Sequence, residues 1–387
     1  MKKEICFVTA TRAEYGLLKP LIKRFNDHVD FNVSIVVTGA HLSPEFGMTV
    51  QEIEFQVDEK IEILLSSDTP AGITKAMGLG LIGFADYFKR KKVDLLFVLG
   101  DRYESLAVGI AAANEKIPIA HLYGGETTEG AIDEFVRHAL TKMSYFHFTS
   151  TEAYRKRVIQ LGEHPERVFC VGSLGVENIT NESLCTKEKL ENELGISLGE
   201  TYALGTFHPV TLQNEDAKDQ IIEVLEACKC FPKTTFLFTK ANADASGRMI
   251  NQMVHEYTTE SEQFFLVSSL GVKKYLSALK HCQFVIGNSS SGLIEAPSFG
   301  VPTINIGDRQ KGRTQADSVI NTPPDKNSIK KAIEKAMTKS FQSMAKKTVN
   351  PYGDGRTSDK IINIVHHNVF NKEIHLMKTF YNITFEI

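Results

Sequence analysis

The sequence predicts an α/β protein made of two doubly wound domains, each a parallel sheet covered by helices on both faces. Three observations lead to this fold class. With 387 residues, the chain is too long for one ordinary hydrophobic core. Its short apolar runs are continuous rather than alternating, which is typical of strands buried on both faces. Amphipathic helical stretches separate these runs, as in a sheet whose crossovers are helices.

In the first half of the chain, apolar runs predict strands and the segments between them predict helices. The strands are expected at Ile5–Thr9, Phe31–Thr38, Asp94–Leu99, Ile117–Leu122, Phe146–Thr149 and Val168–Val171. The helices between them include Glu14–Asp27, Ile73–Lys91, Tyr103–Asn114 and Asp133–Lys142. This rhythm predicts a first Rossmann-like domain over residues 1–175.

A polar segment at residues 172–195 interrupts the rhythm, which restarts beyond it. Further strands are expected at Tyr202–Phe207, Thr235–Thr239, Phe264–Val267, Phe284–Ile286 and Thr303–Ile306. We therefore expect a second domain over residues 176–358. The remaining segment, 359–387, would carry a closing helix at Asp359–Val369 that packs back on the first domain. Doubly wound folds bind ligands at the carboxyl ends of their strands, so we expect a cleft between the two sheets.

The composition indicates a soluble globular protein and argues against several functional classes. Hydrophobic residues make up 42% and charged residues 24%, and the formal net charge is −3, which favours neither nucleic acid nor an anionic membrane. No window approaches the roughly 18 apolar residues of a membrane span, and Ile5–Thr9 is too short for a signal peptide. The cysteines show no CxxC and no zinc spacing. We expect free thiols in a reducing cytoplasm.

Carboxylates gather where the first predicted sheet ends. Asp101 directly follows a strand, Glu126 follows two glycines, and Asp133, Glu134 and Arg137 open a helix. Each acid could be an ordinary helix cap or dipole partner. Together they form a plausible acid–base cluster, because crowded like charges raise one another's pKa values.

Basic and polar side chains follow other strands. Arg12 lies in the turn after the first predicted strand, where a helix N-terminus and a guanidinium would favour an anion. An ordinary arginine on the protein surface explains this position equally well. The turn is not GxGxxG, so no dinucleotide cofactor is expected. His208 ends a strand of the second domain, and Asn242 and Asp244 follow the next one.

The stretch GNSSSGLIEAPSFGVPTINIGDRQKGR, residues 287–313, contains the most specific pattern. An apolar strand runs into an apolar helix through a turn that is rich in hydroxyls and backbone N–H groups, which suits a diphosphate. Glu295, placed in the first turns of that helix, would repel phosphate but could accept hydrogen bonds from a ribose diol. The predicted diphosphate and ribose contacts are Ser289, Ser290, Ser291, Gly292, Glu295, Arg309 and Arg313. The pattern therefore indicates a nucleotide site.

These motifs resemble the hydrolysing UDP-N-acetylglucosamine 2-epimerases of sialic and legionaminic acid biosynthesis. The resemblance rests on TRAEYGLLKPL, LGDRYES, GGETTEGAIDEFVRHALTKMS, FHPVTL, the serine-rich stretch and NPYGDG. It covers about residues 3–369. It implies two domains of the glycosyltransferase-B type (GT-B), a homodimer or homotetramer, a UDP-sugar substrate, no metal and no nicotinamide.

The resemblance also implies a reaction. A base removes the C2 proton as UDP leaves C1, giving a 2-acetamidoglucal; water then adds at C1 and a proton returns to C2 on the opposite face. Matched by position, Asp101 and Asp133 are the catalytic acids, with Glu126, Glu134 and His208 as further catalytic candidates. Arg12, Arg137, His208 and Asn242 join the substrate contacts.

One departure leaves the substrate open. Tyr123 stands in HLYGGE where many members carry a glutamate counted among the catalytic acids. UDP-N-acetylglucosamine, converted to N-acetylmannosamine, is the expected substrate. The alternative is UDP-N,N′-diacetylbacillosamine, which lacks the C6 hydroxyl and carries a second acetamido group. A non-hydrolysing epimerase, a glycosyltransferase and a non-catalytic nucleotide-sugar sensor are further alternatives.

Overall fold

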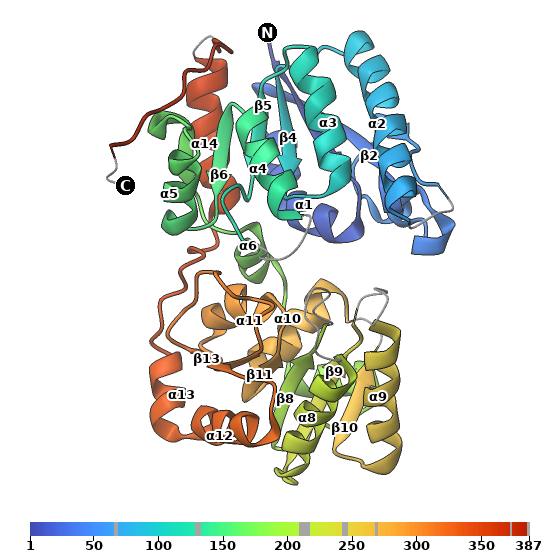
Figure 1. Cartoon of the computed structure of the whole chain (residues 1–387), viewed down its shortest axis with the longest axis vertical. Helices are drawn as coiled ribbons and strands as arrows, with labels where there is room; N and C mark the ends of the chain where they lie inside the picture. Colours follow the sequence, from blue (N-terminus) through green and yellow to red (C-terminus); the bar gives the residue numbers. More distant parts are fainter. Residues whose placement is uncertain are drawn as a thin grey trace. The chain divides into compact units, whose positions relative to one another are not determined.

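The computed structural model describes residues 1–65, 69–127, 133–208, 217–241, 247–267, 270–371 and 374–384. These residues form two compact units (Figure 1). Unit 1 contains the described residues up to Glu177 and those from Tyr352 onward, and unit 2 contains Asn178–Pro351. The chain thus leaves unit 1, builds unit 2 and returns to unit 1.

The described part of unit 1 forms a seven-stranded parallel sheet with the order β3-β2-β1-β4-β5-β6-β7. Its strands are β1 (Lys3–Thr9), β2 (Phe31–Thr38), β3 (Glu59–Ile61), β4 (Leu95–Leu99), β5 (Ile119–Leu122), β6 (Phe146–Thr149) and β7 (Val168–Cys170). Strand β1 pairs with both β2 and β4, so the strand order reverses at β1. Such a reversal is where doubly wound sheets bind ligands.

Helices cover both faces of this sheet. One face packs on α1 (Arg12–Asn26), α14 (Thr357–Val365) and the π-helix η6 (His366–Phe370), with Phe7, Leu18 and Ile361 in a shared core. The other packs on α2 (Pro70–Arg90), α3 (Tyr103–Asn114) and α4 (Asp133–Met143). The remaining helices are α5 (Glu152–Gln160), α6 (Leu174–Asn181), η1 (Gly39–Leu42), η2 (Pro44–Phe46), η3 (Thr49–Glu52) and η4 (Pro165–Arg167).

Unit 2 repeats this plan around a six-stranded parallel sheet with the order β10-β9-β8-β11-β12-β13. Its strands are β8 (Thr201–Thr206), β9 (Thr234–Thr239), β10 (Phe264–Val267), β11 (Phe284–Gly287), β12 (Thr303–Ile306) and β13 (Val319–Thr322). Helices α8 (Ala217–Lys229), α9 (Gly247–Glu260) and α12 (Lys326–Met337) cover one face. Helices α7 (Lys187–Leu194) and α10 (Gly271–His281) cover the other. The short elements α11 (Ser291–Ile294), η5 (Ala296–Phe299) and α13 (Lys339–Ala345) complete the unit.

The fold class predicted from the sequence is confirmed, and two details of it are corrected. Helix α1 begins at Arg12 rather than near Glu14, because Thr11 caps it and Glu14 closes a reciprocal capping box. The helix after the serine-rich turn is a single turn, Ser291–Ile294, so Glu295 is its C-cap and not a residue of its first turns. Pro297 explains this early end, since it lacks the N–H that a continuing α-helix needs.

All six cysteines are free in the structure. No helix within the described ranges has the length and apolar character required to span a membrane.

Candidate active site

The acids of unit 1 meet at the carboxyl ends of its strands, around one buried guanidinium. Arg137, on α4, is 1% exposed and forms an ion pair with Asp101, the second residue after β4. It also donates to a carboxylate oxygen of Glu134 at 2.7 Å and to the backbone C=O of Glu126 at 2.8 Å. A planar fork of several N–H donors can hold all three acceptors at once. Arg137 therefore fixes the two carboxylates; the sequence had placed it among the substrate contacts.

Asp133 is the half-buried first residue of α4. Burial raises the pKa of its carboxyl above the usual range, the nearby Asp101 raises it further, and Arg137 opposes the shift. A carboxyl of this kind is suited to hold and release a proton. Glu126 lies deeper, at 8% exposure, and accepts a hydrogen bond of 2.6 Å from the Ser150 hydroxyl.

Arg12 lies at the same edge of the sheet, at the start of α1. Its Nε is 2.9 Å from a carboxylate oxygen of Glu52, and both side chains are about half exposed. The buried acid at this helix start is Glu14, which accepts hydrogen bonds from the backbone N–H groups of Ala10 and Thr11. Burial raises the pKa of Glu14 to about 7. Arg102, which sequence reasoning missed, lies between Glu14 and Glu104 and binds Glu104 through two nitrogens.

Tyr123 adopts a conformation that is rare for a residue with a side chain, with φ at 69°. Its backbone N–H donates to the backbone C=O of Phe148. Its hydroxyl accepts a hydrogen bond of 2.9 Å from the N–H of Leu174, the first residue of α6. The Ser173 hydroxyl lies 3.2 Å from the same oxygen. Strained backbone of this kind gathers at functional sites. The tyrosine hydroxyl is thus engaged with a helix N-terminus of unit 1.

In unit 2, Asn288 connects three segments at the carboxyl ends of β8, β11 and β12. Its side-chain amide binds both backbone groups of His208, accepting from the N–H at 2.7 Å and donating to the C=O at 2.8 Å. Its own C=O accepts from Arg309 at 2.9 Å and from Gln310 at 2.8 Å. The preceding Gly287 permits this turn: its φ is 132°, and a Cβ there would lie 2.0 Å from the Thr206 oxygen.

His208 is neutral at physiological pH in this environment. Burial lowers the pKa of the imidazole to about 4, and the charge of Arg309 contributes. The side chain is 9% exposed, and its Nδ1 lacks a hydrogen-bond partner among the described residues. A neutral imidazole beside a guanidinium can donate one hydrogen bond to an anion without a second positive charge being buried.

The serine-rich turn follows directly. Ser290 precedes α11 without its hydroxyl capping the helix, and the Ser291 N–H lies 3.4 Å from the Ser289 hydroxyl. Gly292 is held against β12, where its C=O accepts from the Thr303 hydroxyl at 2.7 Å. The Ser291 hydroxyl accepts from Tyr275 at 2.8 Å, an aromatic contact that the sequence did not reveal.

Glu295 lies behind this turn. Burial raises the pKa of its carboxyl to about 7, and the Ser291 hydroxyl opposes the shift. Its Oε2 is enclosed and finds no hydrogen-bond donor in the described part of the chain. A buried acceptor without a partner costs roughly 1–3 kcal/mol, and a ligand that brings hydroxyl donors would recover this energy.

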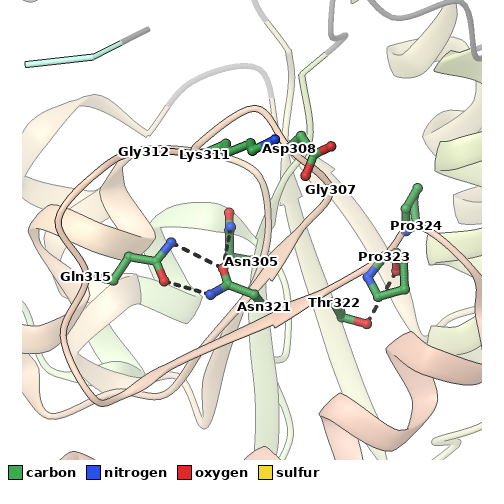
Figure 2. Close-up of a pocket in the computed structure, with 10 residues that line it drawn as sticks. All are labelled: Asn305, Gly307, Asp308, Lys311, Gly312, Gln315, Asn321, Thr322, Pro323 and Pro324. Atoms are coloured by element: carbon green, nitrogen blue, oxygen red, sulfur yellow. Dashed lines mark hydrogen bonds between the residues drawn. The ribbon is translucent and has the colours of Figure 1, made fainter. Parts of the chain in front are cut away.

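A cavity of about 820 Å³ opens at the carboxyl ends of β12 and β13 (Figure 2). Three of its lining amides bind one another: Asn305 donates to Asn321 at 2.8 Å, and Asn321 donates to Gln315 at 2.7 Å. Asp308 and Lys311, also in its lining, flank Arg309 and Gln310 on the same loop. Arg313 follows on this loop, where its backbone N–H donates to the backbone C=O of Gln310. None of the four predicted turn residues, 289–292, lines this cavity.

The structure brings the predicted residues together in two sets. Unit 1 assembles Asp101, Glu126, Asp133, Glu134 and Arg137, and unit 2 assembles the serine-rich turn with His208 and Arg309. Asn242 and Asp244 lie outside the described residues. Sequence reasoning missed Asn288, whose position directly before three serines and after a glycine was the available signal.

Comparison with known proteins gives a consistent result. The family model described as UDP-N-acetylglucosamine 2-epimerase matches residues 23–366. A Campylobacter jejuni protein named GDP/UDP-N,N′-diacetylbacillosamine 2-epimerase (hydrolyzing) is 43% identical over 88% of this chain and 89% of its own. An Escherichia coli protein, polysialic acid biosynthesis protein P7, is 42% identical over 90% of both chains. A Legionella pneumophila UDP-N,N′-diacetylbacillosamine 2-epimerase (hydrolyzing) is 34% identical over 96% of this chain and 99% of its own.

A solved structure shares the fold. The UDP-GlcNAc 2-epimerase of Neisseria meningitidis, in a structure bound to UDP-GlcNAc, superposes with a TM-score of 0.80 at 18% identity and covers 94% of this chain and all of that one. The two-domain GT-B-like architecture therefore extends over nearly the whole molecule.

Proposed function

The chain belongs to the UDP-N-acetylglucosamine 2-epimerase family, and we propose that it is a hydrolysing 2-epimerase whose substrate is UDP-N,N′-diacetylbacillosamine. The observation that carries the choice of substrate is a pair of relatives named for N,N′-diacetylbacillosamine and for hydrolysis. The 43% identical one is named for the GDP or UDP form of this sugar, and the 34% identical one for the UDP form. UDP-N-acetylglucosamine, the substrate expected from the sequence, becomes the second candidate. The 42% identical polysialic acid biosynthesis protein keeps it in consideration.

The proposed reaction divides between the two sets of residues. In the first step a base takes the C2 proton, the C1–O bond breaks, and its electron pair leaves with UDP. In the second step water gives up a proton to a carboxylate and adds its oxygen to C1 of the unsaturated sugar, while a protonated carboxyl delivers a proton to C2 on the face opposite to the one deprotonated. The products are UDP and the free C2-epimeric sugar. One group must therefore remove a proton and another must supply one.

The acid cluster of unit 1 offers groups for both tasks. Asp101 is held in place by the Arg137 guanidinium, which suits a base that must point steadily at one carbon. Asp133 has a raised pKa, which suits a group that carries a proton near neutral pH. We propose Asp101 and Asp133 as the acid–base pair, with Glu134 and Glu126 as supporting carboxylates.

Unit 2 is proposed to bind the UDP portion. The hydroxyls and N–H groups of the serine-rich turn, with His208 and Arg309, would contact the diphosphate. Glu295 has an acceptor oxygen without a partner, which fits a ribose diol. A single helical turn contributes little dipole, so the hydrogen bonds and Arg309 must supply most of the affinity. They would also stabilise the charge that develops on UDP as it leaves.

Proton NMR in heavy water tests the proposal directly. Purified protein receives UDP-N,N′-diacetylbacillosamine, GDP-N,N′-diacetylbacillosamine or UDP-N-acetylglucosamine in separate tubes. Release of UDP with a free diacetamido sugar carrying deuterium at C2, in the first tube alone, is the expected result. Turnover of UDP-N-acetylglucosamine alone would transfer the assignment to the second candidate. Loss of nucleotide without deuterium at C2 in any tube would contradict the epimerase mechanism itself.

A further inference from the structure

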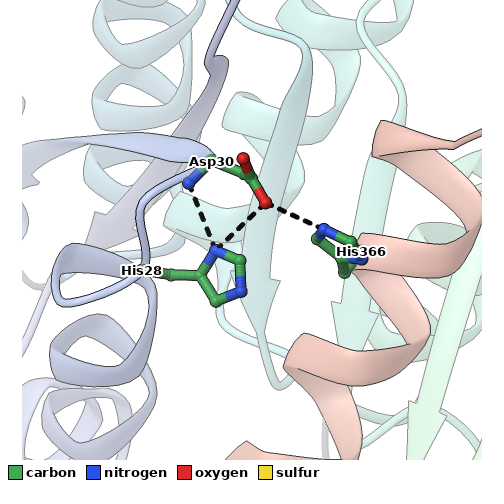
Figure 3. Close-up of side chains that lie close together, drawn as sticks. All are labelled: His28, Asp30 and His366. Atoms are coloured by element: carbon green, nitrogen blue, oxygen red, sulfur yellow. Dashed lines mark hydrogen bonds and ion pairs between the residues drawn. The ribbon is translucent and has the colours of Figure 1, made fainter.

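A second cluster of ligand-type side chains lies on unit 1, away from the acids described above. His28 and Asp30 occupy the turn between α1 and β2, and His366 begins η6 near the end of the chain. Figure 3 shows both imidazole rings turned toward the Asp30 carboxylate, and one possible ligand atom of each residue lies within 4.8 Å of the others. Asp30 Oδ2 lies 2.9 Å from His366 Nε2 and 3.8 Å from His28 Nδ1. We propose that this cluster, the His28–Asp30–His366 site, binds a divalent transition metal, with zinc as the preferred ion.

The distances between the possible ligand atoms of the three side chains are close to those in a tetrahedral zinc site. Zinc binds histidine nitrogen and carboxylate oxygen at about 2.0–2.2 Å, so neighbouring ligand atoms lie roughly 3.3–3.6 Å apart. The two separations from Asp30 fall on either side of this range. One ligand atom from each residue lies within 4.8 Å of the others, so shifts of under about 1 Å would close the set. Imidazole nitrogen suits zinc and other transition metals, whereas magnesium and calcium prefer oxygen ligands, so two imidazoles beside one carboxylate favour zinc.

The rings are already held in place. The His28 ring packs 5.0 Å from the Phe31 ring, and the His366 ring stacks on Phe370 at 5.1 Å with an interplanar angle of 13°. Phe31 contacts His366 as well, edge to face. A site whose ligands are fixed by packing loses less conformational entropy when the metal binds. The π-helical turn that carries His366 is an uncommon element and is frequent at functional sites.

The site has room for exchangeable ligands. All three side chains are about one-third exposed, so water can complete the fourth position. The contact that zinc would replace at His28 is a long one, 3.3 Å from the Asp30 N–H to Nδ1. At His366 it would replace the bond to Asp30, whose carboxylate would then bind the metal instead.

The position of the cluster indicates a structural metal rather than a catalytic one. Asp30 directly precedes β2, whereas Asp101 follows β4, so the two lie at opposite edges of a parallel sheet. Zinc would link residues 30 and 366, which are 336 positions apart, and would fasten the returning C-terminal segment to the rest of unit 1. We therefore expect zinc to raise thermal stability and to leave turnover unchanged.

Isothermal titration of the chelator-treated full chain with Zn²⁺ tests the site. We expect one zinc per chain, and affinity at least about tenfold weaker in both His366→Ala and His28→Ala. His367→Ala, an exposed neighbour on the same element, should bind like the wild type. Circular dichroism checks that each variant is folded, and two variants from separate segments guard against misfolding of one. Equal zinc binding by the wild type and both variants, or none by the folded wild type, would overturn the site. These readouts need no sugar nucleotide, so they stand apart from the proposed reaction.

Discussion

The side-chain amide of Asn288 binds His208 through both of its backbone groups, at 2.7 Å and 2.8 Å. Because its own C=O also accepts from Arg309, one residue sets the relative positions of a candidate phosphate-binding histidine and arginine. Neither contact involves the imidazole of His208, which stays available for a ligand. Asn288 is therefore a positioning residue of the proposed diphosphate site.

Asn288→Asp is expected to weaken UDP binding by about 10–100-fold. The carboxylate cannot donate to the His208 C=O, and it adds a negative charge beside the diphosphate; a hydrogen bond involving a charged group is worth about 1.5–3 kcal/mol. Isothermal titration with UDP measures the effect. Asn327→Asp, at an exposed position of the same unit, controls for the added charge. Equal affinity in Asn288→Asp and wild type would remove Asn288 from the site.

Asp133→Asn is expected to lower kcat by about 10²–10⁴-fold while UDP affinity stays within about tenfold. The amide keeps the shape of the side chain but cannot exchange a proton. Asp101→Asn should have the same kinetic effect, with an added loss of stability because it leaves the buried Arg137 with one fewer carboxylate. Steady-state kinetics and UDP titration on the same samples distinguish an effect on kcat from an effect on UDP affinity. Lost UDP binding with retained turnover would reverse the assignment.

Arg137→Lys is expected to reduce kcat by roughly 100-fold without weakening UDP binding. A single ammonium cannot reproduce the fork that reaches Asp101, Glu134 and the Glu126 C=O, and small displacements of reacting groups can cost this much. Steady-state kinetics and UDP titration measure the change in kcat and the change in UDP affinity separately. A selective loss of UDP affinity would instead restore Arg137 to the substrate contacts, as expected from the sequence.

The affinity for UDP should fall as the pH drops below about 7. Burial raises the pKa of Glu295 to about 7, so the carboxyl is protonated below that pH and ionised above it. A ribose diol donates to the ionised form, so binding lowers this pKa and affinity is lost by up to about tenfold per pH unit on acidification. His208, with its pKa at about 4, stays neutral across this range. Titrations from pH 6 to pH 8 measure the slope.

Glu295→Gln provides the matched control, because glutamine keeps the shape and does not titrate. UDP itself titrates near pH 6, so the informative quantity is the ratio of wild-type to variant affinity at each pH. That ratio should rise with pH and level off above about 7. A ratio that does not change with pH would show that the Glu295 carboxylate does not bind the ribose.

Much of the fold was predictable because its signals are local. Continuous apolar runs marked β2 at Phe31–Thr38, and the helical period marked α3 at Tyr103–Asn114, with the same bounds as in the structure. Of the outermost strands, β3 and β13 were missed, whereas β7 and β10 were predicted. β3 is only three residues long and carries two charges, and β13 ends in polar residues; short, polar edge strands discourage pairing with other chains and also weaken the signal.

The site was predictable only as far as topology determines it. Parallel strands end at one edge, so acids that follow β4 and β5 had to lie near one another. The buried position of Arg137 depends on how α4 packs against the sheet and on its ion pair with Asp101, 36 positions away, which spacing does not reveal. The proposed role of Asn288 depends on the unusual backbone of Gly287 and on the backbone groups of His208, which follows β8. The metal cluster joins residues 28–30 with residue 366, a distance in sequence that no local pattern can report.

The order in which the chain visits its two units has a consequence for synthesis on the ribosome. Asn178–Pro351 is contiguous, so unit 2 can fold as soon as it has emerged. Unit 1 lacks α14 until the last part of the chain is made, and α14 supplies Ile361 and Val365 to its core. At roughly 5–20 residues per second, the N-terminal sheet must wait while all of unit 2 is translated. A nascent chain therefore exposes the apolar surface of α1 that α14 will cover, and chaperone binding during translation is expected there first.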